Sequence, residues 1–370
     1  MSRFLDEIQK HDIPALAASL KNFSPDHVAR SLSASRVGLR EFLSLLSPAA
    51  SEILEDLAGR SRSLTLSRFG RAIQLYTPLY LSNYCLNQCL YCGFRKGNET
   101  QRKTQSPDAV VEEAEFLFRR GFRSLLLVAG DDPEHCSLSY LREVVSRVHA
   151  FVPSVSLEIA PQSVEDYMEL RKAGAEGVVI YQETYGRELY ERLHPEGEKK
   201  DYAWRLETPE RVARAGFHRV GVGALLGLGD PVEEAIALFL HVSFLLKHHW
   251  NTRVTISLPR MRPAEGSIQP LNPVDDRALT QILCALRIAF PDVGIVLSTR
   301  EESRLRDNLI RLGVTQMSAG SRTEPGGYLA PDVQKEQFRV EDGRSPSEVA
   351  AMLASQGYEP VWKDWEGVLV

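Results

Sequence analysis

From about residue 76 onward, short runs of β-branched residues and leucines alternate with longer stretches whose apolar residues recur every three or four positions. The short runs predict buried strands, and the longer stretches predict amphipathic helices. Helices over 108–120 and 164–173 would end at Gly121 and Gly174, because glycine commonly closes a helix. We predict eight strands, at 79–82, 124–129, 155–160, 177–181, 219–225, 253–258, 294–298 and 314–318.

Strands that alternate with helices form parallel sheets, so eight such units predict a (β/α)8 barrel of the TIM type. The last two strands carry the weakest patterns. An open doubly wound sheet, or a partial barrel of six units, is therefore the alternative. In each of these folds ligands bind at the carboxyl ends of the strands.

The chain divides into three parts. Residues 1–70 read as a helical N-terminal extension, 71–330 as the barrel, and 331–370 as a C-terminal segment with a short helix that packs on the barrel. Residues 62–75 are basic and fit a connector or a solvated helix face equally well. Aromatic residues at 361–366 predict that the end of the chain docks. Helix starts are predicted where serine precedes proline, at Ser24, Ser47, Ser106 and Ser345.

The composition is that of an ordinary globular protein, with 43% hydrophobic and 25% charged residues. A net charge of −5 gives no general attraction to nucleic acid or to an anionic membrane, which favours a small-molecule substrate. The longest apolar stretch, 235–246, is too short to span a bilayer. Five cysteines, three of them clustered, suit a reducing compartment, and no secretory signal is visible, so we expect a cytoplasmic protein.

The clustered cysteines Cys85, Cys89 and Cys92 follow the first predicted strand with the spacing Cys-x3-Cys-x2-Cys. Thiolates are soft ligands, so three within eight residues predict one shared metal centre. A structural zinc site needs a fourth ligand, and the nearest later candidates, His135 and Cys136, lie more than forty residues away. The spacing therefore favours a [4Fe-4S] cluster with one iron left open over a zinc site.

The cysteine segment resembles a known family. Cys-x3-Cys-x2-Cys with an aromatic residue, Tyr91, before the last cysteine is the signature of the radical S-adenosylmethionine (SAM) superfamily. The wider stretch 78–94 resembles the tyrosine lyases of thiamine thiazole biosynthesis, the 2-iminoacetate synthases. The resemblance implies that the three cysteines hold the cluster and that Tyr91 belongs to the cofactor site.

Two segments behind the second and third strands are expected to contribute to SAM binding. The superfamily usually has a Gly-Gly-Glu turn that meets the methionyl amine of SAM, where this chain has Ala129-Gly130-Asp131. Gly130 matches that pattern, whereas Ala129 and the shorter Asp131 depart from it, and an ordinary turn is the alternative. Glu158 lies among apolar residues, where a carboxylate needs a partner, so we expect it to line the cofactor site.

The fourth strand ends in Tyr181-Gln182-Glu183-Thr184-Tyr185, which is closely similar to the motif of the tyrosine lyases at this strand. The resemblance implies that Gln182 and Glu183 contact SAM and that Tyr185 borders the substrate. Tyr181 itself reads as a core residue.

Further SAM contacts are implied around the fifth strand. Arg205 aligns with an arginine that binds the SAM carboxylate in related enzymes, and its planar fork suits that group. A solvated arginine is the alternative reading. Gly223 and Leu225 match the Gly-x-Ile/Leu-x-Gly pattern on which adenine lies against the backbone.

The substrate side of the site is predicted at the last two strands. The Ser298-Thr299-Arg300-Glu301 motif matches the tyrosine lyases, and we expect Arg300, with Ser298 beside it, to hold the substrate carboxylate and so to act in catalysis. Ser318, after the eighth strand, is a candidate partner for the substrate amine or carboxylate.

The resemblance implies that a radical formed from SAM abstracts hydrogen from L-tyrosine, whose Cα–Cβ bond then breaks to give 2-iminoacetate and p-cresol. A reduced flavodoxin or ferredoxin-type protein would donate the electron, and a thiazole synthase would be a protein partner. A tryptophan lyase is one alternative, and a non-catalytic iron–sulfur or zinc module is another. The tyrosine lyases of hydrogenase maturation need a further cysteine-bound cluster near the C-terminus, whereas Cys284 is the last cysteine here.

Overall fold

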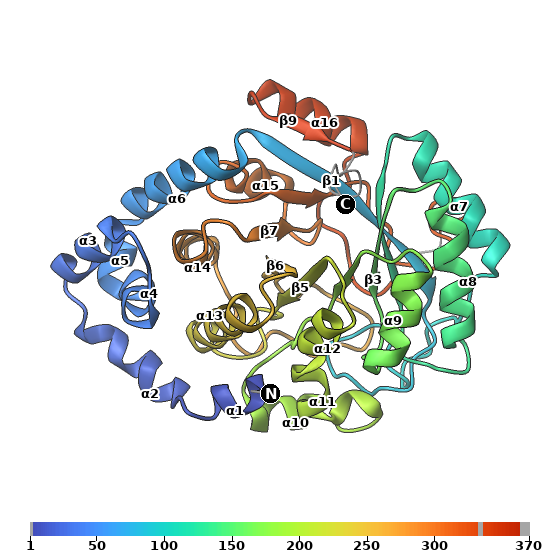
Figure 1. The fold of residues 1–370 in the computed structure, drawn as a ribbon, viewed down its shortest axis with the longest axis horizontal. Coiled ribbons are helices and arrows are strands. Elements are labelled where there is room, and N and C mark those ends of the chain that lie inside the picture. The colour runs from blue at the N-terminus through green and yellow to red at the C-terminus, as the bar shows by residue number, and fades with distance from the viewer. Residues whose placement is uncertain (1–2, 332–335, 363–370) are drawn as a thin grey trace.

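A ring of parallel strands forms the centre of the computed structural model, which describes residues 3–331 and 336–362 (Figure 1). Within these residues the sheet has the order β2-β3-β4-β5-β6-β7-β8-β1, and β1 also pairs with β2, which closes the barrel. The (β/α)8 barrel is therefore confirmed, and the open sheet is excluded. The strands are β1 (Ala72–Ser82), β2 (Ser124–Ala129), β3 (Ser154–Glu158), β4 (Gly177–Val179), β5 (Arg219–Gly223), β6 (Arg253–Ser257), β7 (Gly294–Leu297) and β8 (Gln316–Ser318).

Helices connect the strands and form the outer layer of the barrel (Figure 1). The predicted helix starts at Pro107 and Pro346 are confirmed, and at each of them the preceding serine side chain accepts a backbone N–H of the first turn. These helices are α7 (Pro107–Arg119), α8 (Leu138–His149), α9 (Val164–Lys172), α10 (Arg187–Leu193), η2 (Glu198–Lys200), α11 (Tyr202–Leu206), α12 (Thr208–Arg214), α13 (Pro231–His248), α14 (Asp276–Ala289), α15 (Ser303–Leu309) and α16 (Pro346–Ser355).

The N-terminal extension is helical, as predicted, and curves around one side of the barrel in Figure 1. It packs on α13 and α14, where the Phe42 and Phe239 rings stack 4.4 Å apart and the Gln281 amide donates to the carbonyls of Leu45 and Ser47. Of the basic segment 62–75, residues 62–69 belong to a helix and residues 72–75 belong to β1. The elements are α1 (Phe4–Ile8), α2 (Ile13–Ala18), η1 (Ser19–Asn22), α3 (Pro25–Ser33), α4 (Leu39–Leu46), α5 (Pro48–Glu52) and α6 (Leu54–Phe69).

One strand was not predicted. The strand β9 (Glu359–Val361) pairs in parallel with residues 72–74, the first part of β1, which begins seven residues before its predicted start. Trp362 follows and packs edge-on against Phe122, with the ring centroids 5.3 Å apart, so the described end of the chain docks. Residues 363–366 lie outside the described residues. The division into 1–70, 71–330 and 331–370 stays a prediction.

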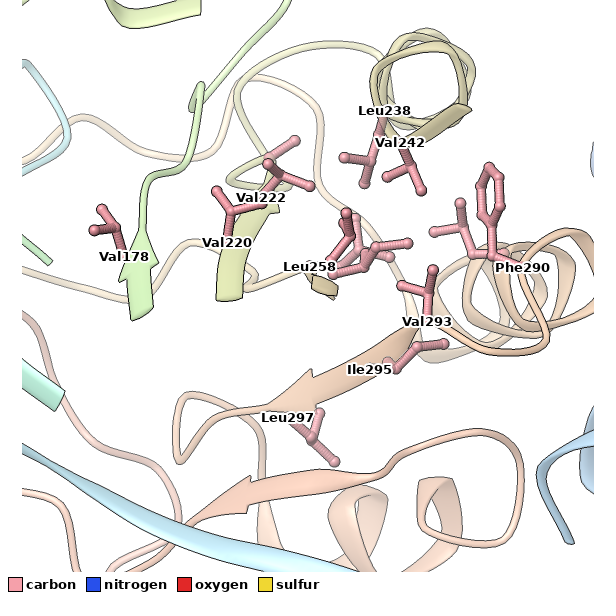
Figure 2. Packing of buried hydrophobic residues seen from close by; sticks show 14 of the residues in the cluster. Val178, Val220, Val222, Leu238, Val242, Leu258, Phe290, Val293, Ile295 and Leu297 are labelled. Carbon is pink, nitrogen blue, oxygen red and sulfur yellow. The ribbon is translucent and has the colours of Figure 1, made fainter. Parts of the chain in front are cut away.

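The main hydrophobic core lies between the strands and the helices. Figure 2 shows Val178, Val220 and Val222 on the outer side of the barrel strands, in the same cluster as Leu238 and Val242 of α13. Side chains alternate along a strand, so the other positions point into the barrel, where tyrosines and polar residues line a cavity. Among the described helices, none combines the length and the apolar character that crossing a membrane requires.

Candidate active site

A cavity with an empty volume of about 970 Å³ lies at the carboxyl ends of the strands, where a barrel of this type binds its ligands. Its lining includes eight of the residues singled out from the sequence, namely Tyr91, Cys92, Glu158, Glu183, Leu225, Ser298, Arg300 and Ser318. Its lining does not include the other eight, namely Cys85, Cys89, Gly130, Asp131, Gln182, Tyr185, Arg205 and Gly223.

The three clustered cysteines lie in one loop after β1, and all are free thiols. Cys89 is buried, and Cys85 and Cys92 are half-buried. Among the described residues, no group of three or more Cys, His, Asp or Glu side chains is placed so that it could hold a single metal ion. In an iron–sulfur cluster each thiolate binds a different iron, so the three sulfurs do not have to meet at one point.

The chemistry of the loop fits an iron–sulfur cluster. Burial raises the pKa of Cys85 to about 12 and also raises the pKa of Cys92, so both thiols are neutral at physiological pH unless a metal takes their protons. The backbone N–H of Phe94 donates to the Cys92 sulfur at 3.4 Å. Hydrogen bonds to ligand sulfurs are a usual feature of such clusters.

Two predicted residues on the β2 side hold the cysteine loop. The Asp131 carboxylate accepts from the Asn87 side-chain amide at 2.7 Å, and the Asp131 carbonyl accepts from the Leu86 N–H at 2.9 Å. A Cβ atom on Gly130 would lie 2.2 Å from the Tyr84 carbonyl oxygen, so a larger residue would displace the loop. Both residues therefore act on the position of the cysteines and lie behind the cavity wall.

A buried cluster of charges forms one wall of the cavity. The Glu183 carboxylate accepts from the Lys199 ammonium at 2.6 Å and from the Arg205 guanidinium at 3.3 Å. Burial alone would raise the pKa of Glu183, but the two cations hold it below its ordinary value. Arg205 also donates to the Tyr181 carbonyl at 2.7 Å. The Glu183 backbone is left-handed, with a φ of 73°, a strained conformation that is typical of functional sites.

The β5 side of the site depends on small residues. A Cβ atom on Gly223 would lie 2.1 Å from the Ser257 carbonyl oxygen, so only glycine allows β5 and β6 to approach here. Leu225 lines the cavity two residues further along. Leu225 therefore gives this side of the cavity an apolar lining residue.

Arg300 is the candidate for binding an anionic group. Its guanidinium lies 3.3 Å from the centroid of the Phe338 ring, and among the described residues it has no carboxylate partner. The neighbouring Arg262, by contrast, is paired with Glu301 at 2.9 Å. Ser298 lines the cavity as well, and its hydroxyl accepts a hydrogen bond from the backbone N–H of Arg300 at 3.4 Å. A carboxylate entering the cavity would therefore meet an unpaired cation.

The comparisons with known proteins agree with this geometry. The Radical SAM superfamily model matches residues 79–241, and the model of the Biotin and Thiamin Synthesis associated domain matches residues 257–359. The chain is 40% identical over 370 residues to the 2-iminoacetate synthase of Escherichia coli K12, covering 100% of this chain and 98% of that protein. The chain belongs to the 2-iminoacetate synthase family. It is a radical SAM enzyme.

Two crystal structures of HydG, a maturase of the [FeFe]-hydrogenase, have the same fold as this radical SAM enzyme. They superpose with TM-scores of 0.91 and 0.88, each at 34% identity, and the second comes from Carboxydothermus hydrogenoformans. The alignments cover 96% and 95% of this chain and 81% and 82% of theirs. A family of this kind implies a [4Fe-4S] cluster and SAM as cofactors.

Gln182 of this radical SAM enzyme lies beyond the end of β4. It is buried between Tyr181 and Glu183, which both line the cavity, whereas Gln182 does not. Neither polar atom of that amide has a partner among the described residues. The contact of Gln182 with SAM stays a prediction.

Tyr185 contacts α13, and its place beside the substrate stays a prediction. Its hydroxyl is hydrogen-bonded to His241 Nδ1 of α13 at 2.9 Å, and its backbone N–H donates to the Glu234 carboxylate at 2.9 Å. These contacts draw Tyr185 into the layer between the barrel and α13. The residue is buried there, outside the cavity lining.

Several residues of the site carry no sequence signal that we recognised. Lys199 pairs with Glu183, and Nε2 of the buried His194 accepts a hydrogen bond of 2.7 Å from the Tyr91 hydroxyl, because its Nδ1–H donates to the Tyr190 carbonyl. Burial lowers the pKa of His194 to about 3, so its ring is neutral. Gln337 and Phe338 reach the cavity from the C-terminal segment. Their contacts join residues far apart in the chain, which no local pattern reveals.

Proposed function

We propose that the protein cleaves the Cα–Cβ bond of L-tyrosine to 2-iminoacetate and p-cresol, while SAM is converted to 5′-deoxyadenosine and methionine. The observation that carries the proposal is the unpaired Arg300 guanidinium in a cavity that Cys92 also lines. An amino acid carboxylate held at Arg300 would place the substrate in the same chamber as the cysteine loop. The 2-iminoacetate synthases that resemble this chain over its whole length support the choice of reaction.

We propose that Cys85, Cys89 and Cys92 hold the [4Fe-4S] cluster, because their thiols form the only clustered set of soft ligands in the described chain. When bound, the cluster and SAM supply the 5′-deoxyadenosyl radical that abstracts hydrogen from the substrate. Glu183, fixed by Lys199, presents an ionised carboxylate to the cavity and is the candidate partner for polar groups of SAM.

The substrate would lie across the barrel. Arg300 holds its carboxylate, and the hydroxyls of Ser298 and Ser318 lie at the same wall. Glu158 enters from the end of β3, among the inward-facing Tyr76 and Tyr80. Burial, followed by the nearby Glu183 carboxylate, raises the pKa of Glu158 to about 7, so this carboxyl can hold or release a proton near neutral pH. These residues bind and orient the amino acid and exclude water from the radical.

We further propose two protein partners for this reaction. A reduced flavodoxin or ferredoxin-type protein would supply the electron, and a thiazole synthase would take up the reactive imine in thiamine thiazole biosynthesis. The free thiols suit a reducing, cytoplasmic compartment.

Product analysis tests the proposal and separates it from a tryptophan lyase. The anaerobically reconstituted protein is incubated with SAM, dithionite and either L-tyrosine or L-tryptophan, and the products are identified by mass spectrometry. We expect p-cresol from tyrosine and no 3-methylindolic acid from tryptophan. Formation of 3-methylindolic acid without p-cresol would show a tryptophan lyase. Absence of 5′-deoxyadenosine in both reactions would show a module without radical chemistry.

A further inference from the structure

The side chain of Gln337, in the C-terminal segment, joins a cluster ligand to a tyrosine of the barrel. Its Nε2 donates to the Cys92 sulfur at 3.7 Å, and its Oε1 accepts from the Tyr80 hydroxyl at 2.7 Å. A cysteine sulfur bound to iron can only accept a hydrogen bond, so the NH₂ end of the amide must face it. The Tyr80 hydroxyl then holds the other end of the amide in place.

The backbone around Gln337 keeps that amide in register with the cysteine loop. The Gln337 carbonyl accepts from the Gly93 N–H at 3.2 Å, and the Gln337 N–H donates to the Thr323 carbonyl at 3.0 Å. A Cβ atom on Gly93 would lie 2.5 Å from the Gln337 carbonyl oxygen, so the absence of a side chain allows this approach. Three further hydrogen bonds, to Tyr80, Gly93 and Thr323, therefore fix Gln337 in its contact with Cys92.

We propose that Gln337 is a positioning residue that raises the reduction potential of the cluster by donating a hydrogen bond to the sulfur of Cys92. Adding an electron makes the cluster and its ligand sulfurs more negative. A fixed N–H donor stabilises that reduced state more than the oxidised state, and hydrogen bonds to sulfur are one of the terms that set these potentials. The inference rests on the cluster of the proposed function. It gives the C-terminal segment a role in electron uptake.

The test compares midpoint potentials of anaerobically reconstituted proteins, measured by EPR-monitored titration with dithionite and redox mediators, without SAM or tyrosine. In Gln337→Leu we expect the equilibrium constant for one-electron reduction to fall about tenfold, which corresponds to a potential lower by 59 mV. Gln337→Glu replaces the donor by an acceptor and should lower the potential at least as far. The iron–sulfur stretching frequencies in resonance Raman spectra should rise in both variants, because the lost hydrogen bond strengthens the bonds from iron to sulfur.

The matched control is Gln281→Leu, which removes a buried glutamine whose side chain also makes two hydrogen bonds, in α14 away from the cysteines. Its potential should equal that of the unaltered protein. If Gln337→Leu loses iron, Tyr80→Phe replaces it, since that variant keeps the amide but releases its far end, and a smaller shift in the same direction is expected.

An unchanged reduction potential in a Gln337 variant that holds its full iron content would overturn the inference. If Gln337→Leu loses iron, an unchanged reduction potential in Tyr80→Phe would overturn it. Failure of the cluster assignment looks different, because the unaltered protein itself would then show no reducible cluster. Failure of the tyrosine reaction would appear in the product analysis and leave these potentials unchanged.

Discussion

The buried ion pair between Lys199 and Glu183 gives the sharpest prediction on stability. Both side chains are 11% exposed, and their charged atoms lie 2.6 Å apart. Lys199→Met keeps most of the side-chain stem and removes the charge, which leaves Glu183 with Arg205 alone at 3.3 Å. Breaking a buried pair costs roughly 3–5 kcal/mol. Because Arg205 remains, we expect a loss at the low end, about 3 kcal/mol at pH 7.

The assay is urea unfolding followed by circular dichroism at pH 7 and at pH 4. The pKa of Glu183 is lowered in the folded protein, so its ionisation stabilises the fold above its ordinary pKa, and this contribution fades as the pH falls. The difference between Lys199→Met and the unaltered protein should therefore narrow at pH 4. Lys172→Met is the control, because Lys172 forms a similar ion pair with Glu169, at 2.8 Å, on the surface. Equal losses in the two variants, or a difference that does not change with pH, would refute the reasoning.

Three further predictions concern Arg300, Tyr185 and Glu158. Arg300→Lys should raise the KM for tyrosine by about tenfold or more with a smaller effect on kcat, since lysine cannot pair bidentately or stack on Phe338 in the same way; an unchanged KM in p-cresol assays would place the substrate carboxylate elsewhere. Tyr185→Phe should cost about 1 kcal/mol of stability through the lost hydrogen bond to His241 and leave the KM for tyrosine within twofold. A large rise in the KM would show that Tyr185 contacts the substrate. Glu158 has a raised pKa, so between about pH 4.5 and 7 the folded state binds more protons than the unfolded state, and stability falls as the pH rises. In Glu158→Gln, urea unfolding should show a weaker fall over this range. Parallel profiles for the two proteins would contradict the assignment.

Much of the fold followed from local patterns. The eight strands could be predicted because the spacing of apolar residues within short stretches of the chain distinguishes strands from helices. Serine followed by proline marked the starts of α7 and α16, because capping depends on neighbouring residues only. The loop of Cys85, Cys89 and Cys92 was also a local signal. In contrast, β9 was missed, because its three residues carry no period of their own and form a strand only by pairing with β1.

The members of one motif occupy different places in the fold. Gln182 and Tyr185 were assigned by the likeness of a whole motif, and both are buried outside the cavity lining, with Tyr185 hydrogen-bonded to His241 of α13. Lys199 and Gln337 could not be found, because each becomes functional only through a partner brought close by folding. Arg300 was found by resemblance, and the structure adds that it has no carboxylate partner among the described residues.

The measurement that tests the central claim most directly is metal and spectroscopic analysis of the anaerobically purified protein. The account predicts about four irons per chain, an EPR signal of a reduced [4Fe-4S] cluster that changes when SAM is added, and loss of both iron and SAM cleavage when Cys89 is replaced by alanine. One zinc per chain without iron, or SAM cleavage that survives the replacement of Cys89, would contradict it.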